Sequence, residues 1–334
     1  MLNKKITIIV PTYNAVDTIS ASIDSAFRLG EALDQLVVVD DRSTDNLQNY
    51  LLKKYPEAIK AKKIRYIVGE GKGAGEARNQ ALKFVKSEYL MFLDADDELI
   101  NTQTIKEVLD NSDTFDIIVF SGRAENNMKL NQIDAMQSNL GITKSNLYDS
   151  GPVSKLFATD NIKRHKIMFP DNVIIGEDMI FNMRAILVSK NIFLKAKSIY
   201  RVNENEQSIT HVLNFEESFC DRERLVSNIK ITLSGTQYEG FLDDIVSKSF
   251  AMLIVDFAKS DVSLFVGASN MKLFIKRSGV SIKEIFTFST LYFGKIQATL
   301  VYLSARVPLL GLALFKMLYR VKRLSKKGED SYNI

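Results

Sequence analysis

The sequence predicts an α/β fold, with a mostly parallel sheet covered by helices and a helical C-terminal region. Three observations predict it. Short, continuously apolar runs recur through residues 1–120, as in strands buried on both faces. Segments with apolar residues at helical spacing lie between these runs. The last third of the chain lacks the strand pattern and is typical of helices.

The individual elements follow from this alternation. We expect strands at 6–10, 36–39, 64–68, 89–93 and 115–120, and helices at 17–28, 45–54 and 75–86. The pattern is less regular over 121–212, with helices expected near 153–163 and 178–189. From residue 215 the chain is predicted to be almost wholly helical. We therefore predict two domains, residues 1–213 and 214–334.

Composition excludes several classes of protein. Of the 334 residues, 46% are hydrophobic and 25% charged, which is typical of a globular chain. A net charge of +4 is too small for a dedicated nucleic-acid binder. The single cysteine, Cys220, excludes an internal disulfide framework and a cysteine-based zinc site, and we expect it to be buried. The apolar run at 6–10 is too short for a signal peptide, so we expect a cytoplasmic protein.

Polar and glycine-rich segments follow three of the predicted strands. Asp40-Asp41 ends the second strand, the loop 69–75 follows the third, and Asp94-Ala95-Asp96 follows the fourth. Ligands of parallel sheets bind beyond the carboxyl ends of the strands. These segments should therefore meet at one edge of the sheet.

Asp94 and Asp96 have the residue type and spacing of a metal site. Carboxylates crowded at a strand end repel one another unless a cation lies among them, and hard oxygen ligands suit Mg²⁺ or Mn²⁺. The alternative is an acidic turn before a helix that begins near Asn101.

The other two segments also have two interpretations. One carboxylate of Asp40-Asp41 is available for a nucleobase or ribose, while Asp45 is expected to cap the next helix. The glycine loop lets backbone approach a ligand closely, although it is neither a dinucleotide fingerprint nor a P-loop. Arg78 could neutralise a diphosphate, or it could form a surface salt bridge.

Six blocks then occur in a characteristic order. They are Ile9–Asn14, Val38–Asp45, Ala77–Asn79, Phe92–Asp97, Lys155–Phe157 with Phe169-Pro170 and Gly176–Phe181, and Tyr200-Arg201 with Ser208–Thr210. Over residues 5–212 this series resembles the family 2 glycosyltransferases, which have the GT-A fold. The family commonly has glycine where Arg42 stands, and this departure falls in a turn.

The resemblance implies a role for each site residue. For the donor, it implies that Pro11, Thr12 and Tyr13 line the base pocket, that Asp40 or Asp41 holds uracil or ribose, and that Arg78 and Asn79, after Gly75, contact base or phosphate. In the segment Asp94-Ala95-Asp96, Asp94 would contact ribose or a metal-bound water and Asp96 would bind Mn²⁺ or Mg²⁺, with His211 as a candidate third metal contact. The catalytic base would be Asp178, beside Glu177. Family members usually invert the anomeric centre.

Asp178 also has a purely structural interpretation. It begins a predicted helix after Gly176, where the helix dipole favours acidic residues in any case. The same dipole should lower the pKa of Asp178 and weaken it as a base.

The C-terminal region combines apolar and basic residues. Residues 285–319 are rich in Phe, Leu, Tyr and Val, and 316–327 contains Lys316, Arg320, Lys322, Arg323, Lys326 and Lys327 without an acid. This pattern fits a helix at an anionic membrane surface, while Arg306 and Pro308 argue against a membrane span. The alternative is a helix packed on the core or on a second copy in a homo-oligomer. We expect peripheral contact through 285–327 at the inner face of the cell membrane.

The function expected from these features is transfer of a sugar from a UDP-sugar to a hydroxyl of a glycan or lipid-linked acceptor, with inversion, in cell-surface polysaccharide synthesis. A sugar nucleotidyltransferase is an alternative, but it needs a glycine-rich basic loop where Pro11–Asn14 stands. A non-catalytic nucleotide- or glycan-binding module is another. Neither the donor sugar nor the acceptor follows from the sequence.

Overall fold

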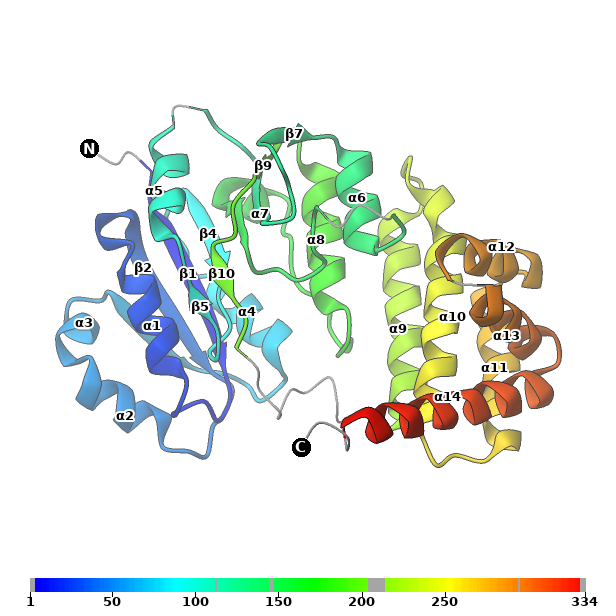
Figure 1. The fold of residues 1–334 in the computed structure, drawn as a ribbon. Coiled ribbons are helices and arrows are strands. Elements are labelled where there is room, and N and C mark those ends of the chain that lie inside the picture. Colours follow the sequence, from blue (N-terminus) through cyan, green and yellow to red (C-terminus); the bar gives the residue numbers. More distant parts are fainter. Residues whose placement is uncertain (1–3, 112, 144–146, 204–213, 294, 331–334) are drawn as a thin grey trace. The chain divides into compact units, whose positions relative to one another are not determined.

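The chain divides into two compact units, residues 1–207 and 208–334. The computed structural model describes residues 4–111, 113–143, 147–203, 214–293 and 295–330, without the side chains of 321–330. The expected domain boundary after residue 213 falls in 204–213, outside the described residues. Figure 1 shows a sheet with surrounding helices in the first unit and helices in the second.

The first unit is built on an eight-stranded sheet of order β3-β2-β1-β4-β8-β6-β9-β7. Its strands are β1 (Ile6–Thr12), β2 (Leu33–Asp40), β3 (Ile64–Val68), β4 (Tyr89–Phe92), β6 (Ile117–Phe120), β7 (Met128–Leu130), β8 (Lys155–Ala158) and β9 (Ile192–Lys195). The strands β1 to β4 are parallel, whereas β8 is antiparallel to both of its neighbours, β4 and β6. A separate antiparallel pair joins β5 (Glu98–Leu99) to β10 (Tyr200–Arg201).

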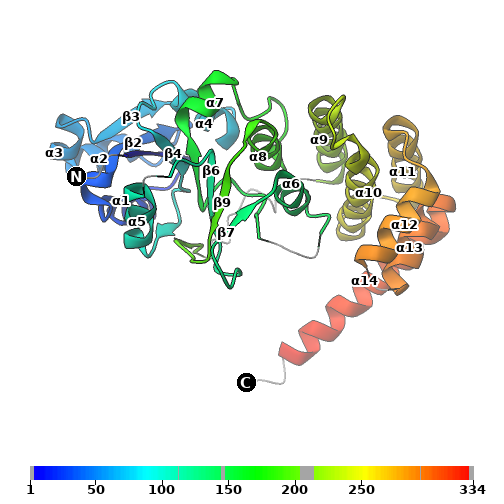
Figure 2. The ribbon, with the colours of Figure 1, turned by 90° about the horizontal axis from the view of Figure 1, so that it is seen from above.

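Helices cover both faces of this sheet. They are α1 (Ile19–Phe27), α2 (Leu47–Lys54), α3 (Pro56–Lys60), α4 (Ala74–Leu82), α5 (Thr102–Asp110), α6 (Gln132–Leu140), α7 (Thr159–Arg164) and α8 (Glu177–Val188). All seven residues of β1 are buried, as a strand covered on both faces requires. Ile6, Ile8 and Val10 pack in one cluster with residues of α1 and α5, whereas α4 lies on the other face (Figure 2).

The sequence-based elements of residues 6–120 are confirmed, with shifts of a few residues at their ends. The helix expected near 153–163 is wrong in its first half. Residues 155–158 form β8, whose hydrogen bonds to β4 and β6 come from distant parts of the chain. Only the segment from Thr159 to Arg164 is helical. Long-range pairing has overridden local helical spacing here.

Asp45 does not cap α2, so that prediction is also wrong. The N-cap is Asn46, in left-handed backbone and without a side-chain cap hydrogen bond. The Asp45 carboxylate instead accepts a hydrogen bond from the Val16 N–H at 2.8 Å. It therefore ties the loop after β1 to the loop after β2.

The second unit is helical, as predicted. It comprises α9 (Phe215–Leu233), α10 (Leu242–Lys259), α11 (Leu264–Ser278), α12 (Ile282–Tyr292), α13 (Lys295–Arg306) and α14 (Pro308–Asp330). Capping boxes at Asn214 and Ser281 begin α9 and α12. Cys220 in α9 is exposed, which corrects the expectation of a buried cysteine; it lies on the solvent side of an amphipathic helix. Within the described part of the chain, no helix has both the length and the apolar content to cross a bilayer.

Candidate active site

The ends of β1 and β2 lie side by side at the carboxyl edge of the sheet. Thr12 pairs with Asp40, and Pro11 pairs with Val39. Pro11 and Thr12 are buried, whereas the Tyr13 side chain beyond them is 58% exposed. The structure therefore presents Tyr13 to solvent next to the end of β2, as a base-stacking side chain requires.

Asp40 is buried at this edge, and both of its carboxylate oxygens accept a hydrogen bond. The Ser43 N–H donates to Oδ1 at 2.7 Å, and the Tyr66 hydroxyl donates to Oδ2. Burial is the largest cause of the raised pKa of Tyr66, and the hydrogen bond to Asp40 adds to it. Tyr66 therefore stays protonated as a donor to the carboxylate.

Asp41 holds the glycine loop in place. Its Oδ1 accepts hydrogen bonds from the N–H groups of Gly71 at 2.7 Å and Lys72 at 3.2 Å. Its Oδ2 accepts one from Gly73 at 2.7 Å. Gly71 and Gly73 have φ of +76° and +92°, which side chains rarely adopt. The glycines therefore let the loop wrap around a carboxylate of the protein itself.

Arg42 occupies a left-handed position, with φ of +67°. Such a conformation costs a non-glycine residue roughly 1 kcal/mol, which explains the glycine that the resembled family commonly has there. The side chain of Arg42 lies over the glycine loop, because a Cβ on Gly71 would meet its Cδ at 3.1 Å. The departure at Arg42 thus leaves the acidic positions in place.

The acidic turn after β4 separates its carboxylates. Asp97 is buried: Tyr200 donates its hydroxyl to Oδ2 at 2.8 Å, and the Asn203 N–H donates to Oδ1 at 2.9 Å. Burial raises the pKa of Asp97. Tyr200 also accepts the Asp94 N–H at 3.1 Å. Asp97 therefore fixes the turn from inside, and Asp94 and Asp96 remain partly exposed.

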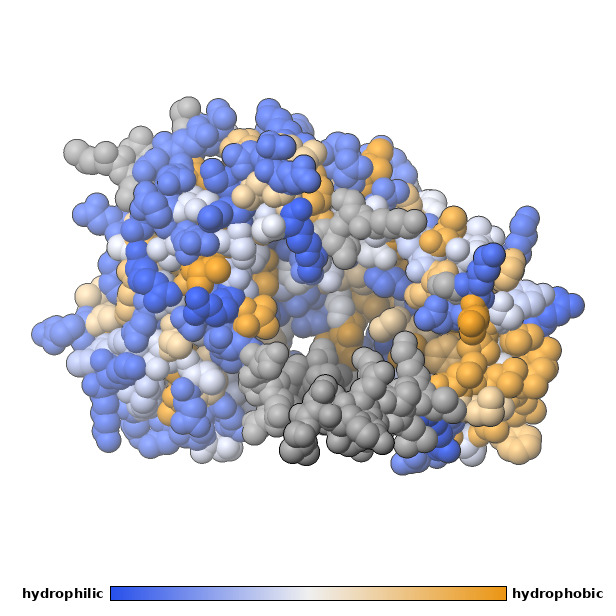
Figure 3. Space-filling view, viewed as in Figure 1, coloured by the Kyte–Doolittle hydropathy of each residue, from blue (hydrophilic) through white to orange (hydrophobic). Residues whose placement is uncertain are grey.

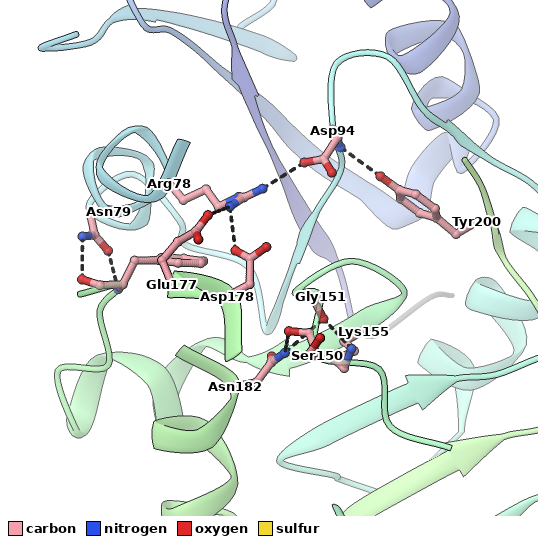
Figure 4. Close-up of polar contacts among 11 residues, drawn as sticks. Arg78, Asn79, Asp94, Ser150, Gly151, Lys155, Glu177, Asp178, Asn182 and Tyr200 are labelled. Atoms are coloured by element: carbon pink, nitrogen blue, oxygen red, sulfur yellow. Dashed lines mark hydrogen bonds and ion pairs between the residues drawn. The ribbon is translucent and has the colours of Figure 1, made fainter. Parts of the chain in front are cut away.

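Arg78 on α4 connects the acidic turn after β4 to the start of α8 (Figure 4). Its side chain is only 5% exposed, and it contacts Asp94 at 2.9 Å and Asp178 at 2.8 Å, with Glu177 at 3.8 Å. Burial alone would lower the pKa of Arg78, but the nearby carboxylates of Asp178, Asp94 and Glu177 raise it. The surface salt bridge considered from the sequence is therefore wrong. The guanidinium is a buried counter-ion for three carboxylates.

The helices α4 and α8 meet closely behind Arg78. Asn79 brackets the main chain of Phe169, accepting its N–H at 2.8 Å and donating to its carbonyl at 3.1 Å. A Cβ on Gly75 would lie 3.3 Å from Glu177 Cγ and 3.4 Å from Phe169 Cβ. Gly75 and Asn79 therefore set the distance between α4 and the start of α8.

Glu177 and Asp178 form the first turn of α8, and Asp178 is 28% exposed. Burial raises the pKa of Asp178 above its ordinary value, against the opposing effect of the Arg78 charge. The expectation of a lowered pKa is therefore wrong, because desolvation outweighs the favourable charges around the carboxylate. A raised pKa suits a carboxylate that accepts a proton near neutral pH.

The metal ligands predicted from sequence are only partly described. Asp94 is 37% exposed, with Oδ1 directed at Arg78, and Asp96 is half-buried. His211 lies outside the described residues. Within those residues, no three His, Cys, Asp or Glu side chains are grouped as metal ligands. Two carboxylates with substrate phosphates are nevertheless a usual ligand set for Mg²⁺.

Four residues of the site had no predicted role: Tyr66, Asp97, Lys155 and Asn182. Lys155 belongs to a block that the sequence analysis quoted, but nothing in its local pattern indicates a buried lysine. The sequence shows Asp97 only as a third acid of the turn. Its inward-facing position depends on a hydrogen bond from Tyr200, more than a hundred positions later.

The chain is similar in sequence to known proteins. Residues 7–171 match the profile of the family described as glycosyl transferase family 2. A poly(ribitol-phosphate) β-glucosyltransferase of Bacillus spizizenii is 29% identical over 215 residues, covering 59% of this chain and 32% of that protein. The poly(ribitol-phosphate) β-N-acetylglucosaminyltransferase TarS of Staphylococcus aureus is 28% identical over 232 residues, covering 67% of this chain and 40% of TarS. The chain thus spans well under half the length of these relatives.

A solved structure shows the same fold. Residues 1–349 of S. aureus TarS, in complex with UDP-GlcNAc, superpose with a TM-score of 0.68 at 20% identity, covering 95% of this chain and 92% of that one. The likeness includes a mostly parallel sheet flanked by helices and a helical C-terminal region. The profile match over residues 7–171 identifies the chain as a family 2 glycosyltransferase, and the superposition shows that it has the GT-A fold.

Proposed function

We propose that this protein is an inverting glycosyltransferase that moves a sugar from a UDP-sugar to a hydroxyl of a glycan or lipid-linked acceptor. The observation that carries the proposal is the pairing of one buried guanidinium with Asp94 and Asp178. It holds a carboxylate of the acidic turn next to a partly exposed carboxylate with a raised pKa. Donor binding and proton abstraction require these two groups side by side.

The names of the relatives support the substrate classes. Two of them act on poly(ribitol phosphate), and TarS has been solved with UDP-GlcNAc. An Escherichia coli relative named as a glucosyltransferase for GlcNAc-diphosphoundecaprenol is 42% identical over 92 residues. We therefore propose UDP-glucose or UDP-GlcNAc as the donor and cell-surface polysaccharide synthesis as the setting.

In the proposed reaction, Asp178 accepts the proton of the acceptor hydroxyl. The hydroxyl oxygen bonds to C1 of the sugar as the C1–O bond to UDP breaks, and UDP leaves with the electron pair. The base and the leaving group lie on opposite faces of the sugar, so the anomeric centre inverts. Arg78 holds the carboxylates of Asp94 and Asp178 in place through its two ion pairs.

For the donor, we assign the base to Pro11, Thr12, Tyr13 and Asp40. Asp40 is preferred to Asp41, because each of its oxygens accepts one hydrogen bond, whereas Oδ1 of Asp41 already accepts two. Asp94 and Asp96 would hold Mn²⁺ or Mg²⁺. This fits their partial exposure and the inward turn of Asp97. The metal would neutralise charge on the leaving diphosphate.

The variant Asp178→Asn tests the assignment of the base. We expect transfer from UDP-glucose or UDP-GlcNAc to fall by about a hundredfold or more, since general-base catalysis contributes about that much. Affinity for UDP with Mn²⁺, measured by calorimetry, should stay within about twofold, because Asp178 touches the acceptor side.

Asp110→Asn, which removes an exposed carboxylate at the end of α5, is the matched control and should keep full activity. Wild-type turnover by the Asp178 variant would exclude that residue as the base. Binding of UDP without any transfer or hydrolysis by the wild type would favour the non-catalytic binding module instead. Activity that survives chelation would remove the metal from the proposal.

We also propose that the second unit binds peripherally to an anionic membrane surface. Residues 285–328 contain eight Lys or Arg and no Asp or Glu. On α12 to α14, exposed apolar side chains include Leu291, Ile296, Leu310 and Met317, each at least 51% exposed. Figure 3 shows apolar atoms gathered over the region of α13 and the start of α14. Apolar side chains beside excess positive charge suit an interface with anionic lipid.

Lys316 is an exception within the basic region. Its ammonium donates to the Val262 carbonyl at 3.2 Å and lies 4.7 Å from the Phe257 ring centroid. Burial lowers its pKa. The basic surface expected over 316–327 therefore excludes Lys316. Arg320 is exposed, and the side chains after it are outside the described residues.

A further inference from the structure

A buried ammonium lies beside the candidate base. Lys155, the first residue of β8, is fully buried, and its Nζ donates to the Gly151 carbonyl at 2.6 Å and to Val153 at 3.4 Å. The ammonium also lies 4.7 Å from the centre of the Tyr148 ring. No carboxylate of the described residues forms an ion pair with it. Burying a charge without an ion pair is costly, so this position calls for a role.

A second buried donor reaches the same main chain. Asn182 is fully buried on α8, one turn after Asp178, and its Nδ2 donates to Ser150 O at 2.7 Å and to Gly151 O at 3.0 Å. Lys155 and Asn182 therefore converge on one carbonyl from two different elements (Figure 4). We call residues 149–153 the clamped segment. The Oδ1 of Asn182 has no hydrogen-bond partner among the described residues.

In Figure 4, Ser150 and Gly151 of the clamped segment lie on a different side of Asp178 from Arg78. The charges of Lys155 and Asp178 also affect each other's pKa. The Lys155 charge lowers the pKa of Asp178 against the effect of burial, and Asp149 and Asp178 oppose the burial that lowers the pKa of Lys155 to about 8. The donor-side groups, Arg78 and Asp94, thus occupy one flank of the base and the clamped segment the other.

Resting on the proposed function, we propose that Lys155 and Asn182 are positioning residues that hold the clamped segment against Asp178 as a wall of the acceptor site. The acceptor hydroxyl has to reach Asp178 from the flank that the donor leaves open. Two residues of the segment, Asp149 and Ser150, are exposed. A carboxylate and a hydroxyl suit the hydroxyl groups of a sugar or polyol chain.

The test compares Lys155→Met, Lys155→Arg and Asn182→Ala with wild type. The matched control is Lys63→Met. The Lys63 ammonium also bonds two main-chain carbonyls, those of Leu33 at 2.9 Å and Asp34 at 3.2 Å, but these lie at the start of β2, whereas the candidate site lies at its other end. Three quantities are measured: UDP affinity with Mn²⁺, hydrolysis of UDP-GlcNAc or UDP-glucose without acceptor, and transfer to poly(ribitol phosphate) or GlcNAc-diphosphoundecaprenol.

We expect Lys155→Met and Asn182→Ala to lower kcat/KM for the acceptor about tenfold or more, since misplacing a reacting group by an ångström costs about a hundredfold. UDP affinity and hydrolysis should stay within about twofold. The acid limb of the pH–rate profile should move to higher pH in Lys155→Met and remain in place in Lys155→Arg. A merely structural lysine would not lower transfer while UDP affinity and hydrolysis are retained.

Transfer by both variants at the level of Lys63→Met would overturn the proposal. So would a parallel loss of UDP affinity, hydrolysis and transfer, which indicates general damage to the fold. If Lys155→Met does not fold, Asn182→Ala decides alone, because it leaves the Lys155 ammonium and its bond to the Gly151 carbonyl in place. A wild-type protein that transfers nothing would instead end the proposed function itself.

Discussion

At the residue scale, the central feature is one cation shared among carboxylates. Arg78 is buried between Asp94 and Asp178, and it also lies 5.3 Å from the Phe169 ring centroid and 5.9 Å from that of Phe92. The aromatic rings keep water away, so each charge acts more strongly than it would at the surface. Protonation of Asp178 therefore depends directly on Arg78.

Arg78→Met should change the pH dependence of transfer. Arg78 lowers the pKa of Asp178, and its removal raises that pKa further. Because the base must be ionised, the acid limb of kcat/KM should move to higher pH. The variant should also lose about 1–2 kcal/mol of stability, a modest value because Asp94 and Asp178 are partly exposed. Denaturant unfolding and pH–rate profiles measure the two effects.

Arg78→Lys retains the charge and should leave the acid limb closer to its wild-type position, although it cannot contact both carboxylates with a planar fork. Arg65→Met removes an arginine that stacks on Phe84 instead, and serves as the control. An acid limb that does not move in Arg78→Met would mean that Arg78 does not tune Asp178.

At the element scale, the site depends on how closely two helix ends approach. The start of α4 reaches α8 at Gly75, and Asn79 fixes Phe169 between them. The first turn of α8 then presents Asp178 to Arg78. The glycine is required by this contact, since its φ is not in the left-handed region.

Gly75→Val should push α4 away from α8 and lower transfer at least about tenfold. The first added carbon already lies 3.3 Å from Glu177, and the branched methyl groups have no room. Gly75→Ala should have a milder effect. Kinetics together with thermal unfolding would separate misalignment from unfolding. Gly240→Val, where the added carbon meets nothing within 4 Å, is the control; full activity of Gly75→Val would contradict the packing explanation.

At the scale of the whole molecule, chemistry and surface properties are divided between two units. The residues proposed for catalysis belong to residues 1–207, whereas the acid-free basic stretch belongs to 208–334. Membrane binding and transfer are therefore expected to respond to different substitutions.

The protein should sediment with vesicles that contain anionic lipid and stay in solution with purely zwitterionic vesicles. Binding should weaken as salt rises, because the attraction is electrostatic in part. Changing Ile296 and Leu310 together to Gln should reduce binding while hydrolysis of the donor stays unchanged. Phe265→Gln, an exposed apolar residue on α11, is the matched control. Concentration-dependent dimers without vesicle binding would assign this face to a second copy of the chain.

Much of this organisation follows from sequence. Continuous apolar runs separated by helical spacing predict the strands β1 to β4, because both patterns reflect local burial. The acidic and glycine-rich segments after those strands are found at the predicted edge of the sheet. Only the resemblance to a family suggests Asp178 as the base, because spacing alone leaves it as an ordinary helix-start residue.

The tertiary structure alone decided how the charged groups are used. Asp41 holds the glycine loop, Asp97 turns inward to Tyr200, and Lys155 lies in a strand instead of the expected helix. Each outcome depends on partners tens of residues away, and on the balance between burying a charge and satisfying it. Local patterns record which residues are acidic or apolar, but only the packed fold determines which of them remain available for a substrate.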